Sequence, residues 1–371
     1  MTADGGVKTP VIQFGTSRFL QAHADLFLSE ATLPLTVTIV QTSGDAARSR
    51  RLAALAAPEG YPVRIRGLSE GRVVDETKTV TSVTRCLSAS TEWTQVVRVF
   101  VEEAEFVLSN TGDAGYQSQP EDGAATYHPS MSFPAKLFHL LAARHAAGAA
   151  PLVVMPMELV VDNGAVLKNA VLAVARLRGG SDALISYIEE RVFWACSLVD
   201  RIVSEPMEPA GAVAEPYALW AIQKGPGIVA PCIHPAIEMV DDLTEIERLK
   251  LHILNLGHTV LVDLWRRRGG QGDPIVRTFM ASPGVLDELM EIYRREVIPV
   301  FAHLGQGEAS ERYMAVTLER FANPFLDHRL VDIGQNHAQK IERRIKAFVD
   351  LAHRSGYPHQ QPRLMRILSS G

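Results

Sequence analysis

The sequence predicts an α/β protein in which a Rossmann-type, doubly wound N-terminal domain is followed by a mostly α-helical C-terminal domain. Strand-like apolar runs alternate with helical segments up to about residue 240, beginning with Val11–Phe14, which ends at Gly15. Beyond residue 240 the patterns are helical almost throughout. Because such a change in element type marks a domain boundary, we expect one domain at residues 1–240 and a second at residues 241–371.

The order of elements at the N-terminus is that of a βαβ unit. We expect a strand at Val11–Phe14, a tight turn at Gly15 and a helix at Phe19–Ser29, then a second strand at Val37–Val40 and an arginine-rich helix at Ala46–Ala57. The glycine pattern is weak, since only Gly15 is present where G-x-G-x-x-G has three glycines. No acidic residue closes the second strand to hold a ribose hydroxyl.

Further strands and helices alternate through the rest of the first domain. Expected strands are Val63–Gly67, Arg72–Val74, Glu105–Ser109, Leu152–Met155, Leu198–Val203, Tyr217–Gln223 and Ile228–Ile233, and expected helices are Trp93–Glu103, one starting at Phe133, Ala165–Arg178 and Asp182–Glu190. The polar loop Asn110–Gly115 follows a buried-type strand, at the end where doubly wound sheets bind ligands. A plain connection explains that loop equally well. Gln117–Ser132, rich in Gly, Pro and Ser, predicts a mobile surface loop.

The amino-acid composition excludes several classes of protein. A net charge of −5 over 371 residues gives no reason to expect a nucleic-acid or anionic membrane partner. No apolar run reaches the ~20 residues of a membrane-spanning helix, and the N-terminus lacks a signal-peptide core. Three scattered cysteines suit a reducing cytoplasm. Cys232 and His234 are close, but without a second pair at zinc spacing we expect no metal.

The second domain opens with a long helix expected over Asp241–Arg268. Asp242 and Glu245 have the spacing of a capping box, apolar residues recur at helical spacing, and Gly269 follows three arginines at the C-terminal end. Later helices are expected at Gly284–Leu304, Ser310–Arg320 and Leu326–His353.

One side of this long helix is polar in its middle. At about 100° per residue, Asn255 lies roughly 140° round from Lys250, and His258 falls between them. Three groups able to exchange protons or hydrogen bonds therefore share one side of an otherwise apolar helix. A solvated face with an ordinary surface lysine is the alternative interpretation.

Short motifs along most of the chain resemble those of one known family. They are Ile12-Gln-Phe-Gly15, Phe19-Leu-Gln-Ala-His23, Ser109-Asn-Thr-Gly-Asp-Ala-Gly115, Phe133-Pro-Ala-Lys-Leu137, Pro156-Met-Glu-Leu159, Asp162-Asn-Gly164, Leu198-Val-Asp-Arg-Ile202, Lys250-x4-Asn255-x2-His258, and Arg320-Phe-Ala-Asn-Pro324 with Lys340. In this order they resemble the long-chain, polyol-specific dehydrogenases of the mannitol dehydrogenase family, and within it the tagaturonate reductase (altronate oxidoreductase) branch.

The resemblance implies a metal-independent, NAD-dependent oxidoreductase with its substrate bound between the two domains. It implies that Lys250 is the general acid/base, that Asn255 helps to hold the alkoxide and that His258 contacts the substrate. Further substrate-binding candidates are Asp200, Glu158, Arg320 and Asn323. Candidate cofactor-binding residues are Phe14, Gly15, Phe19, Gln41, Asn110, Thr111 and Lys136.

The chemistry explains why these residue types suit the reaction. Loss of hydride from a secondary alcohol yields a carbonyl only if the hydroxyl proton also leaves. A lysine can accept that proton when burial or the positive nicotinamide lowers its pKa. A neighbouring asparagine amide donates to the developing oxyanion.

Departures from the family pattern bear on the substrate. Glu158-Leu159 stands where polyol-oxidising members have Asp-Asn, which favours the sugar-acid branch. Leu256 separates Asn255 from Gly257, Gln21 stands where an arginine is common, and the chain is shorter than the usual hexuronate enzymes. We therefore expect a keto sugar acid (tagaturonate/altronate-like) as substrate, with a polyol dehydrogenase or a non-catalytic nucleotide- or sugar-acid-binding protein as alternatives.

Several assignments keep a second interpretation. Asp200 and Arg201 can be a structural ion pair, and His23 suits helix packing. Glu158 can be a cofactor-side acceptor, a substrate contact or a buried carboxylate, and Arg320 and Asn323 can close the helical domain onto the site. The arginines that follow the second strand suit either a 2′-phosphate or a solvated helix face, and we choose NAD over NADP; they are Arg48, Arg50 and Arg51. We expect a monomer or a small homo-oligomer.

Overall fold

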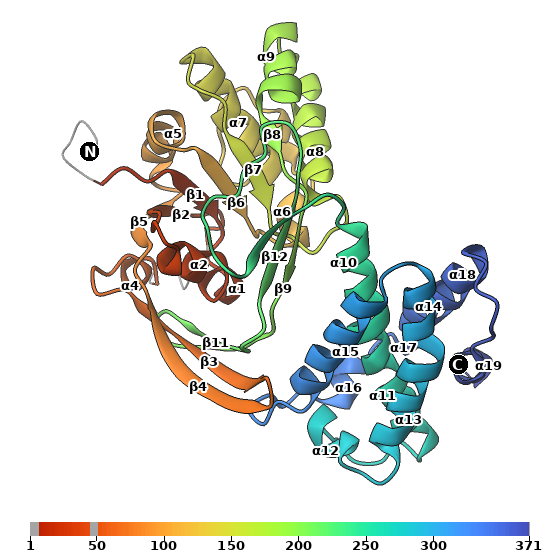
Figure 1. Cartoon of the computed structure of the whole chain (residues 1–371). Helices are drawn as coiled ribbons and strands as arrows, with labels where there is room; N and C mark the ends of the chain where they lie inside the picture. Colours follow the sequence, from red (N-terminus) through yellow and green to blue (C-terminus); the bar gives the residue numbers. More distant parts are fainter. Residues whose placement is uncertain (1–6, 45–50, 371) are drawn as a thin grey trace. The chain divides into compact units, whose positions relative to one another are not determined.

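The computed structural model describes residues 7–44 and 51–370, which fall into two compact units (Figure 1). The Rossmann unit contains the chain up to Ile65, Glu76–Ala214 and Ala218–Leu243, and the helical unit contains Arg66–Asp75, Glu215–Tyr217 and the chain from Thr244. Two segments from the first 240 residues thus belong to the helical unit. The predicted division of the chain at residue 240 assigns both segments to the first domain.

The Rossmann unit is built on a six-stranded parallel sheet in the order β5-β2-β1-β6-β7-β8. Taken in chain order this is 3-2-1-4-5-6, the strand order typical of dinucleotide-binding folds. The expected fold class is confirmed. Strands β1, β2 and β7 are buried along their whole length, as expected for a sheet covered on both faces. The strands are β1 Val11–Phe14, β2 Val37–Gln41, β5 Val83–Ser88, β6 Phe106–Ser109, β7 Val153–Pro156 and β8 Phe193–Trp194.

The helices that pack on this sheet begin where the sequence predicts them. Ser132 caps α7 by accepting the Ala135 N–H, and Pro134 occupies its first turn. One apolar core joins the inner faces of α5, α7 and α8 to the sheet. The helices are α5 Trp93–Glu102, α7 Phe133–Ala146, α8 Asn163–Leu177 and α9 Asp182–Ser186. Short helical turns also lie at α4 Leu52–Leu55, α6 Asp113–Tyr116, η1 Pro120–Gly123 and the π turn η2 Tyr187–Arg191.

The prediction of a single helix at Phe19–Ser29 is wrong. The chain forms two helices there, α1 Arg18–Gln21 and α2 Ala24–Glu30. The break is at His23, whose backbone leaves the helical region at φ −128° and ψ −95°. The buried His23 imidazole bonds the Leu219 carbonyl at 3.0 Å, and burial lowers its pKa to about 3, so the ring is neutral. The packing role expected for His23 therefore accounts for the break.

The segment expected as one strand at Leu198–Val203 is two strands in different sheets. β9 (Ser197–Asp200) pairs with β12 (Leu219–Gln223), whereas β10 (Val203–Pro206) pairs with β11 (Ala212–Ala214). Between them Arg201 turns away and donates to the Ala22 carbonyl at 2.8 Å. Arg201 therefore has a structural contact with the end of α1.

Two further strand predictions differ from the structure. Ile228–Ile233 is a turn region, because Pro231 interrupts the apolar run. The strand beside β12 is β13 (Ile237–Val240), in the sheet β13-β12-β9. The remaining sheet, β10-β11-β3-β4, contains the hairpin of β3 (Tyr61–Ser69) and β4 (Arg72–Val80).

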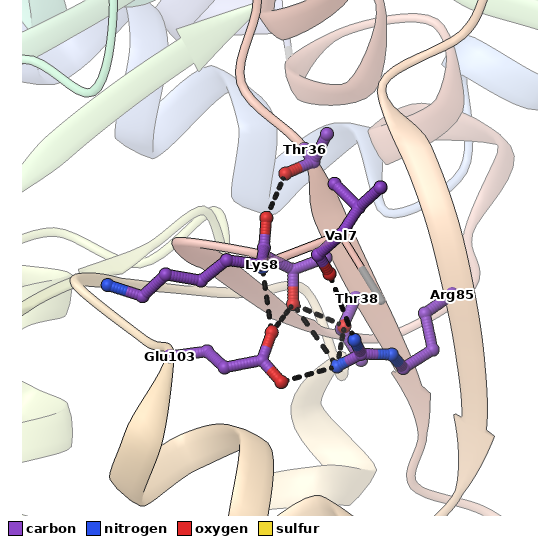
Figure 2. A network of polar contacts seen from close by, with 7 residues as sticks. Val7, Lys8, Thr36, Thr38, Arg85 and Glu103 are labelled. Carbon is purple, nitrogen blue, oxygen red and sulfur yellow. Dashed lines mark hydrogen bonds and ion pairs between the residues drawn. The ribbon is translucent and has the colours of Figure 1, made fainter. Parts of the chain in front are cut away.

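A buried polar network ties the starts of the parallel strands together (Figure 2). The backbone N–H and hydroxyl of Thr9 donate to Glu103 at 2.7 and 3.0 Å, and Arg85 donates to the same carboxylate at 3.0 Å. The Thr9 hydroxyl also contacts Thr38 at 2.7 Å. Burial raises the pKa of Glu103, but these bonds outweigh it and leave the pKa below its usual value. The carboxylate is therefore ionised and holds the sheet at the end opposite the ligand-binding edge.

The helical unit is formed almost entirely by helices around its own apolar core. The long helix expected at Asp241–Arg268 is one continuous helical stretch, but a π turn (η3) separates α10 from α11. The helices predicted at Gly284–Leu304 and Ser310–Arg320 are present, whereas the one predicted at Leu326–His353 is interrupted, because α16 ends at Ile333 and α17 begins at His337. The elements are α10 Thr244–Leu249, η3 Lys250–Asn255, α11 Leu256–Arg267, α12 Val276–Met280, α13 Val285–Ile292, η4 Tyr293–Val297, α14 Ile298–His303, α15 Gly307–Phe321, α16 Leu330–Ile333, α17 His337–Ile341, η5 Glu342–Lys346, α18 Ala347–Arg354 and α19 Pro362–Ser370.

The tip of the β3–β4 hairpin, Arg66–Asp75, belongs to the helical unit, and we call it the arm. The carboxylate of Glu319 on α15 accepts the backbone N–H groups of Glu70 and Gly71 at 3.2 and 2.6 Å. The guanidinium of Arg66 lies 4.0 Å over the ring of Phe325. The arm is therefore part of the helical unit by hydrogen bonding as well as by packing.

Across the residues that the structure describes, no helix combines the length and the apolar character needed to cross a membrane.

Candidate functional site

Gly15 shapes the turn at the carboxyl end of β1. Its φ of +121° favours glycine, and a Cβ there would lie 2.6 Å from the carbonyl oxygen of Asn110. The Ser17 hydroxyl accepts the Leu20 N–H at the start of α1 and donates to the Asn110 side chain at 3.1 Å. The turns after β1 and β6 are thus held together at the edge where Rossmann folds bind dinucleotides.

A cavity of about 300 Å³ opens at this edge. Gln21 joins two of its walls, since its amide donates to the Thr16 carbonyl at 3.1 Å and accepts the Gly211 N–H at 2.8 Å. The sequence shows Gln21 only as a departure from the family pattern, and the structure gives it this role. The cavity is lined by residues 15–18, Gln21, Thr42, Arg51, Asn110, Thr111, Pro206, Met207 and Pro209–Gly211. Backbone N–H groups, hydroxyls and a turn without a Cβ fit the pyrophosphate of a dinucleotide.

The cavity gathers three of the predicted cofactor-binding residues, Gly15, Asn110 and Thr111. The other four lie outside its lining. Phe14 packs in the core against Phe133, with ring centroids 5.3 Å apart, and Phe19 stacks on His23. Gln41 is buried at the end of β2. Thr16, Ser17, Arg18 and Thr42 were not predicted, although their position directly after Gly15 and β2 is a usable signal.

Lys136, the last predicted cofactor-binding residue, is buried at the start of α7. Its ammonium donates to the carbonyls of Met131 and Thr42 at 2.6 and 3.2 Å. Burial lowers its pKa to about 8. Lys136 therefore supports the turn after β2 from behind, while Thr42 faces the cavity.

Among the arginines considered for a 2′-phosphate, Arg51 lines the cavity and pairs with Glu208 at 2.7 Å. Arg48 and Arg50, with most of the expected helix Ala46–Ala57, lie outside the described residues. An exposed arginine already neutralised by a carboxylate gives no reason to prefer the phosphorylated cofactor.

Glu158 supports the loop after β6. Its buried carboxylate accepts the Ser109 hydroxyl and the Thr111 N–H, both at 2.9 Å. Both lie at the ligand-binding edge, so Glu158 fixes their backbone. Of the three roles considered from sequence, these contacts favour the cofactor side.

The motif around Asn163 has a structural function. The Asn163 amide donates to the carbonyls of Pro156 and Ser197 and accepts the Ser197 N–H, each at 2.9 Å. It thereby ties the end of β7 to β9. Asp200, at the other end of β9, is buried and lies opposite Leu219 in the sheet.

The π turn η3 changes the geometry of the polar side of the long helix. The Leu256 N–H donates to the Leu251 carbonyl, five residues back. A π turn has more residues per turn than an α-helix, so the angle between Lys250 and Asn255 is smaller here than the roughly 140° of a regular helix. Both side chains are partly exposed, whereas His258 is buried.

His258 lies in a group of basic side chains, which we call the basic cluster: His258, His328, Lys340 and Arg344. The His258 ring packs on Phe321 at 4.5 Å and on His328 at 4.8 Å, nearly at right angles to the latter. Burial, followed by the neighbouring His328 and Arg344, lowers the pKa of His258 well below its usual value. The imidazole is therefore neutral at neutral pH. The Asp332 carboxylate raises the pKa of His328, but burial lowers it by more.

Arg320 and Asn323 make structural contacts. Arg320 pairs with Glu215 at 2.8 Å, both side chains are almost fully buried, and the guanidinium lies 4.7 Å over the Tyr217 ring. Asn323 donates to the Arg66 carbonyl of the arm at 3.3 Å. These contacts all lie within the helical unit, where they give both side chains a structural role.

Family comparisons match this architecture over nearly the whole chain. Residues 9–231 match the mannitol dehydrogenase Rossmann domain, and residues 242–361 match the mannitol dehydrogenase C-terminal domain. The chain belongs to the mannitol dehydrogenase family. The predicted resemblance is confirmed.

Two relatives with similar sequences carry the same name. Altronate oxidoreductase of Halalkalibacterium halodurans is 28% identical, with 90% of this chain and 69% of that protein aligned. Altronate oxidoreductase of Escherichia coli O1:K1 / APEC is 30% identical, with 90% and 73% aligned.

Solved structures share the fold at lower identity. A D-sorbitol dehydrogenase in substrate-free form has a TM-score of 0.77 at 20% identity, covering 94% of this chain and 76% of that one. The ternary complex of Pseudomonas fluorescens mannitol 2-dehydrogenase with NAD and D-mannitol has a TM-score of 0.69 at 18% identity, covering 98% and 78%. Both confirm a mannitol dehydrogenase fold.

Proposed function

We propose that this protein interconverts a keto sugar acid and its hydroxy form, of the tagaturonate and altronate type, with Lys250 as general acid/base. As a member of the mannitol dehydrogenase family it is an NAD-dependent oxidoreductase that acts on the CH–OH group of a sugar acid or polyol. The altronate oxidoreductase relatives support the sugar-acid substrate.

The observation that supports the catalytic proposal is the π turn η3, which runs from Lys250 to Asn255 and narrows the angle between them relative to an α-helix. In the reductive direction Lys250 gives its proton to the carbonyl oxygen as the oxygen gains electron density. The Asn255 amide donates a hydrogen bond to the same oxygen. In oxidation Lys250 takes the hydroxyl proton. Neutral His258 orients a substrate hydroxyl without adding charge.

Cofactor residues follow from the cavity at the sheet edge. Gly15, Ser17 and Thr111 would hold the pyrophosphate and the adjacent ribose, and Glu158 positions Thr111 from behind. When bound, NADH supplies the hydride. Asp200 is proposed as a further substrate-side residue, and Arg320 and Asn323 as positioning residues that keep α15 in place.

The basic cluster favours an acidic substrate over a polyol. The Lys340 ammonium donates to the Ile333 carbonyl at 2.7 Å, and its pKa is lowered by burial and by the charge of Arg344. Lys340 and Arg344 are the cations of this cluster, because the pKa values of both histidines are lowered, and cations held close together stabilise a carboxylate. A polyol offers only neutral hydroxyls to such a group.

The decisive test of the catalytic proposal is Lys250→Ala. We expect NADH-linked turnover to fall by about 10²–10⁴-fold, while the Kd for NADH, measured by fluorescence, changes little. Lys346→Ala is the matched control, since Lys346 is an exposed lysine of the same unit paired with Glu342. Retention of most activity in Lys250→Ala would overturn the assignment.

The substrate class is tested by a panel of keto-uronates, pentuloses and alditols, followed by NADH absorbance. We expect turnover of a keto-uronate. Turnover of alditols alone would establish the polyol alternative, and no turnover with either cofactor would favour a nucleotide- or sugar-acid-binding protein.

Location and assembly complete the proposal. The three cysteines are free and partly buried, which suits the cytoplasm. We propose a monomer or a small homo-oligomer, which sedimentation velocity at micromolar concentration would resolve.

A further inference from the structure

The carbonyl groups of the η3 turn receive hydrogen bonds from side chains far away in the sequence. The hydroxyl of Tyr293, the first residue of η4, donates to the Ile253 carbonyl at 2.8 Å. The guanidinium of Arg344, in η5, donates to the Asn255 carbonyl at 3.2 Å. Two other π turns thus supply the donors that this π turn uses.

Such donors matter because a π turn is rare and less regular than an α-helix. At its end the N–H of Leu256 reaches five residues back to Leu251 and also approaches the Ile253 carbonyl. The change of register leaves carbonyls that point away from the regular ladder, where inserted side chains stabilise them. Tyr293 is fully buried, so no water competes for its bond to Ile253.

Gly257 makes room for this arrangement. A Cβ at this position would overlap the Tyr293 hydroxyl and lie 3.1 Å from the Phe321 ring. Gly257 lies within α11 at ordinary helical geometry. The position therefore requires glycine because there is no space for a Cβ, and not because of its backbone conformation. Glycine at 257 and tyrosine at 293 are therefore complementary.

Arg344 fixes the same turn from a second direction. Its guanidinium also donates to the Thr259 hydroxyl at 3.2 Å, and that hydroxyl donates to the Asn255 carbonyl at 3.0 Å. The backbone carbonyl of Arg344 lies 3.1 Å from His252 Nδ1. The start of α11 is thus held on both sides of Asn255.

We propose that Tyr293 and Arg344 are positioning residues that hold the η3 turn and thereby keep Lys250 and Asn255 on one side of the helix. The inference rests on the proposed function, because it concerns the same catalytic pair. Were the turn to relax to an α-helix, the two side chains would diverge by roughly 140°. Neither Tyr293 nor Arg344 needs to touch substrate for this role.

Tyr293→Phe tests the inference with the smallest change. We expect kcat to fall by about 10–100-fold, since small misplacements of catalytic groups have effects of that size. The KM for NADH should stay within about twofold of wild type. Amide hydrogen exchange of Leu256 and Gly257 should accelerate. Tyr357→Phe is the matched control, because Tyr357 packs at the edge of the same core.

A double-variant cycle adds a readout that a merely structural role would not give. Gly257→Ala should lower kcat by displacing the Tyr293 hydroxyl. Gly257→Ala combined with Tyr293→Phe should lose less than the product of the two single losses, because the closest contact of the methyl group, the Tyr293 hydroxyl, is already gone. Losses that simply multiply would overturn the inference.

Two outcomes separate this inference from the catalytic proposal. If Lys250→Ala is inactive while Tyr293→Phe keeps wild-type kcat and hydrogen exchange, the positioning role of Tyr293 is refuted and the catalytic assignment of Lys250 stands. If Lys250→Ala remains active, the catalytic assignment itself fails. Should Tyr293→Phe not fold, Arg344→Gln tests the turn from the other side. The kcat should fall and amide hydrogen exchange of Leu256 and Gly257 should accelerate, whereas loss of a substrate-binding cation alone would leave that exchange unchanged.

Discussion

Asp25 makes the stability of the Rossmann unit depend on pH. Its side chain is fully buried in α2 and accepts the Tyr61 hydroxyl at 2.8 Å. Burial raises its pKa from 3.8 to about 7, although the bond from Tyr61 acts in the opposite sense. The folded state therefore holds this proton to higher pH than the unfolded state does.

The direction and size of the effect follow from proton linkage. Because the folded pKa of Asp25 is raised, its contribution is fully favourable below about pH 4 and is lost as the pH rises through 7. A shift of about three pKa units corresponds to about 4 kcal/mol in total. Between pH 5 and pH 8 the loss is about 2–3 kcal/mol of unfolding free energy.

Asp25→Asn removes the titration while keeping the shape of the side chain. We expect the unfolding free energy of the variant not to show the loss of about 2–3 kcal/mol that proton linkage gives for wild type between pH 5 and pH 8. Urea unfolding at both pH values, followed by the fluorescence of Trp220 in the core of this unit, measures it. Asp182→Asn, at an exposed aspartate, should keep the wild-type dependence. Parallel pH curves for wild type and Asp25→Asn would refute the reasoning.

Three other substitutions test other parts of the structure. Arg320→Ala removes the cation paired with the buried carboxylate of Glu215 and should destabilise the helical unit by about 3–5 kcal/mol, seen as a lower Tm; an unchanged Tm would show that the pair contributes little. Glu158→Gln weakens the acceptor of the Thr111 N–H and should raise the Kd for NADH by about tenfold, measured by fluorescence quenching. Gly15→Ala places a methyl group against a backbone carbonyl and should abolish detectable NADH binding in calorimetry, whereas wild-type affinity would contradict the assigned cavity.

The parallel sheet could be predicted because its strands are buried on both faces and are therefore continuous apolar runs. That pattern identifies Val37–Gln41 and Val153–Pro156 almost to the residue. It fails at Ile228–Ile233, where an apolar run containing proline forms a turn, and at Ile237–Val240, where a short half-buried strand carries a charged residue. An apolar run predicts that a segment is buried. It does not predict which other segment will pair with it as a strand.

The candidate site was predicted by residue type more than by geometry. Lys250 and Asn255 stand out from sequence on one side of a helix, but the π turn between them does not, because it is held by Tyr293, about 40 residues further along the chain. The structural roles of Gln21 and Arg320 likewise depend on partners distant in sequence, Gly211 and Glu215. Local patterns cannot predict such contacts.

The arm also affects how the protein is made. The backbone of Gly71 bonds to Glu319, 248 residues later in the chain. At a synthesis rate of about 5–20 residues per second, the arm leaves the ribosome roughly 12–50 s before its partner helix exists. A chain ending near residue 240 would carry the arm without α15, and a chain beginning there would have α15 without the arm. The helical unit can therefore be completed only when the whole polypeptide has been synthesised, so that neither half is a natural fragment for separate expression.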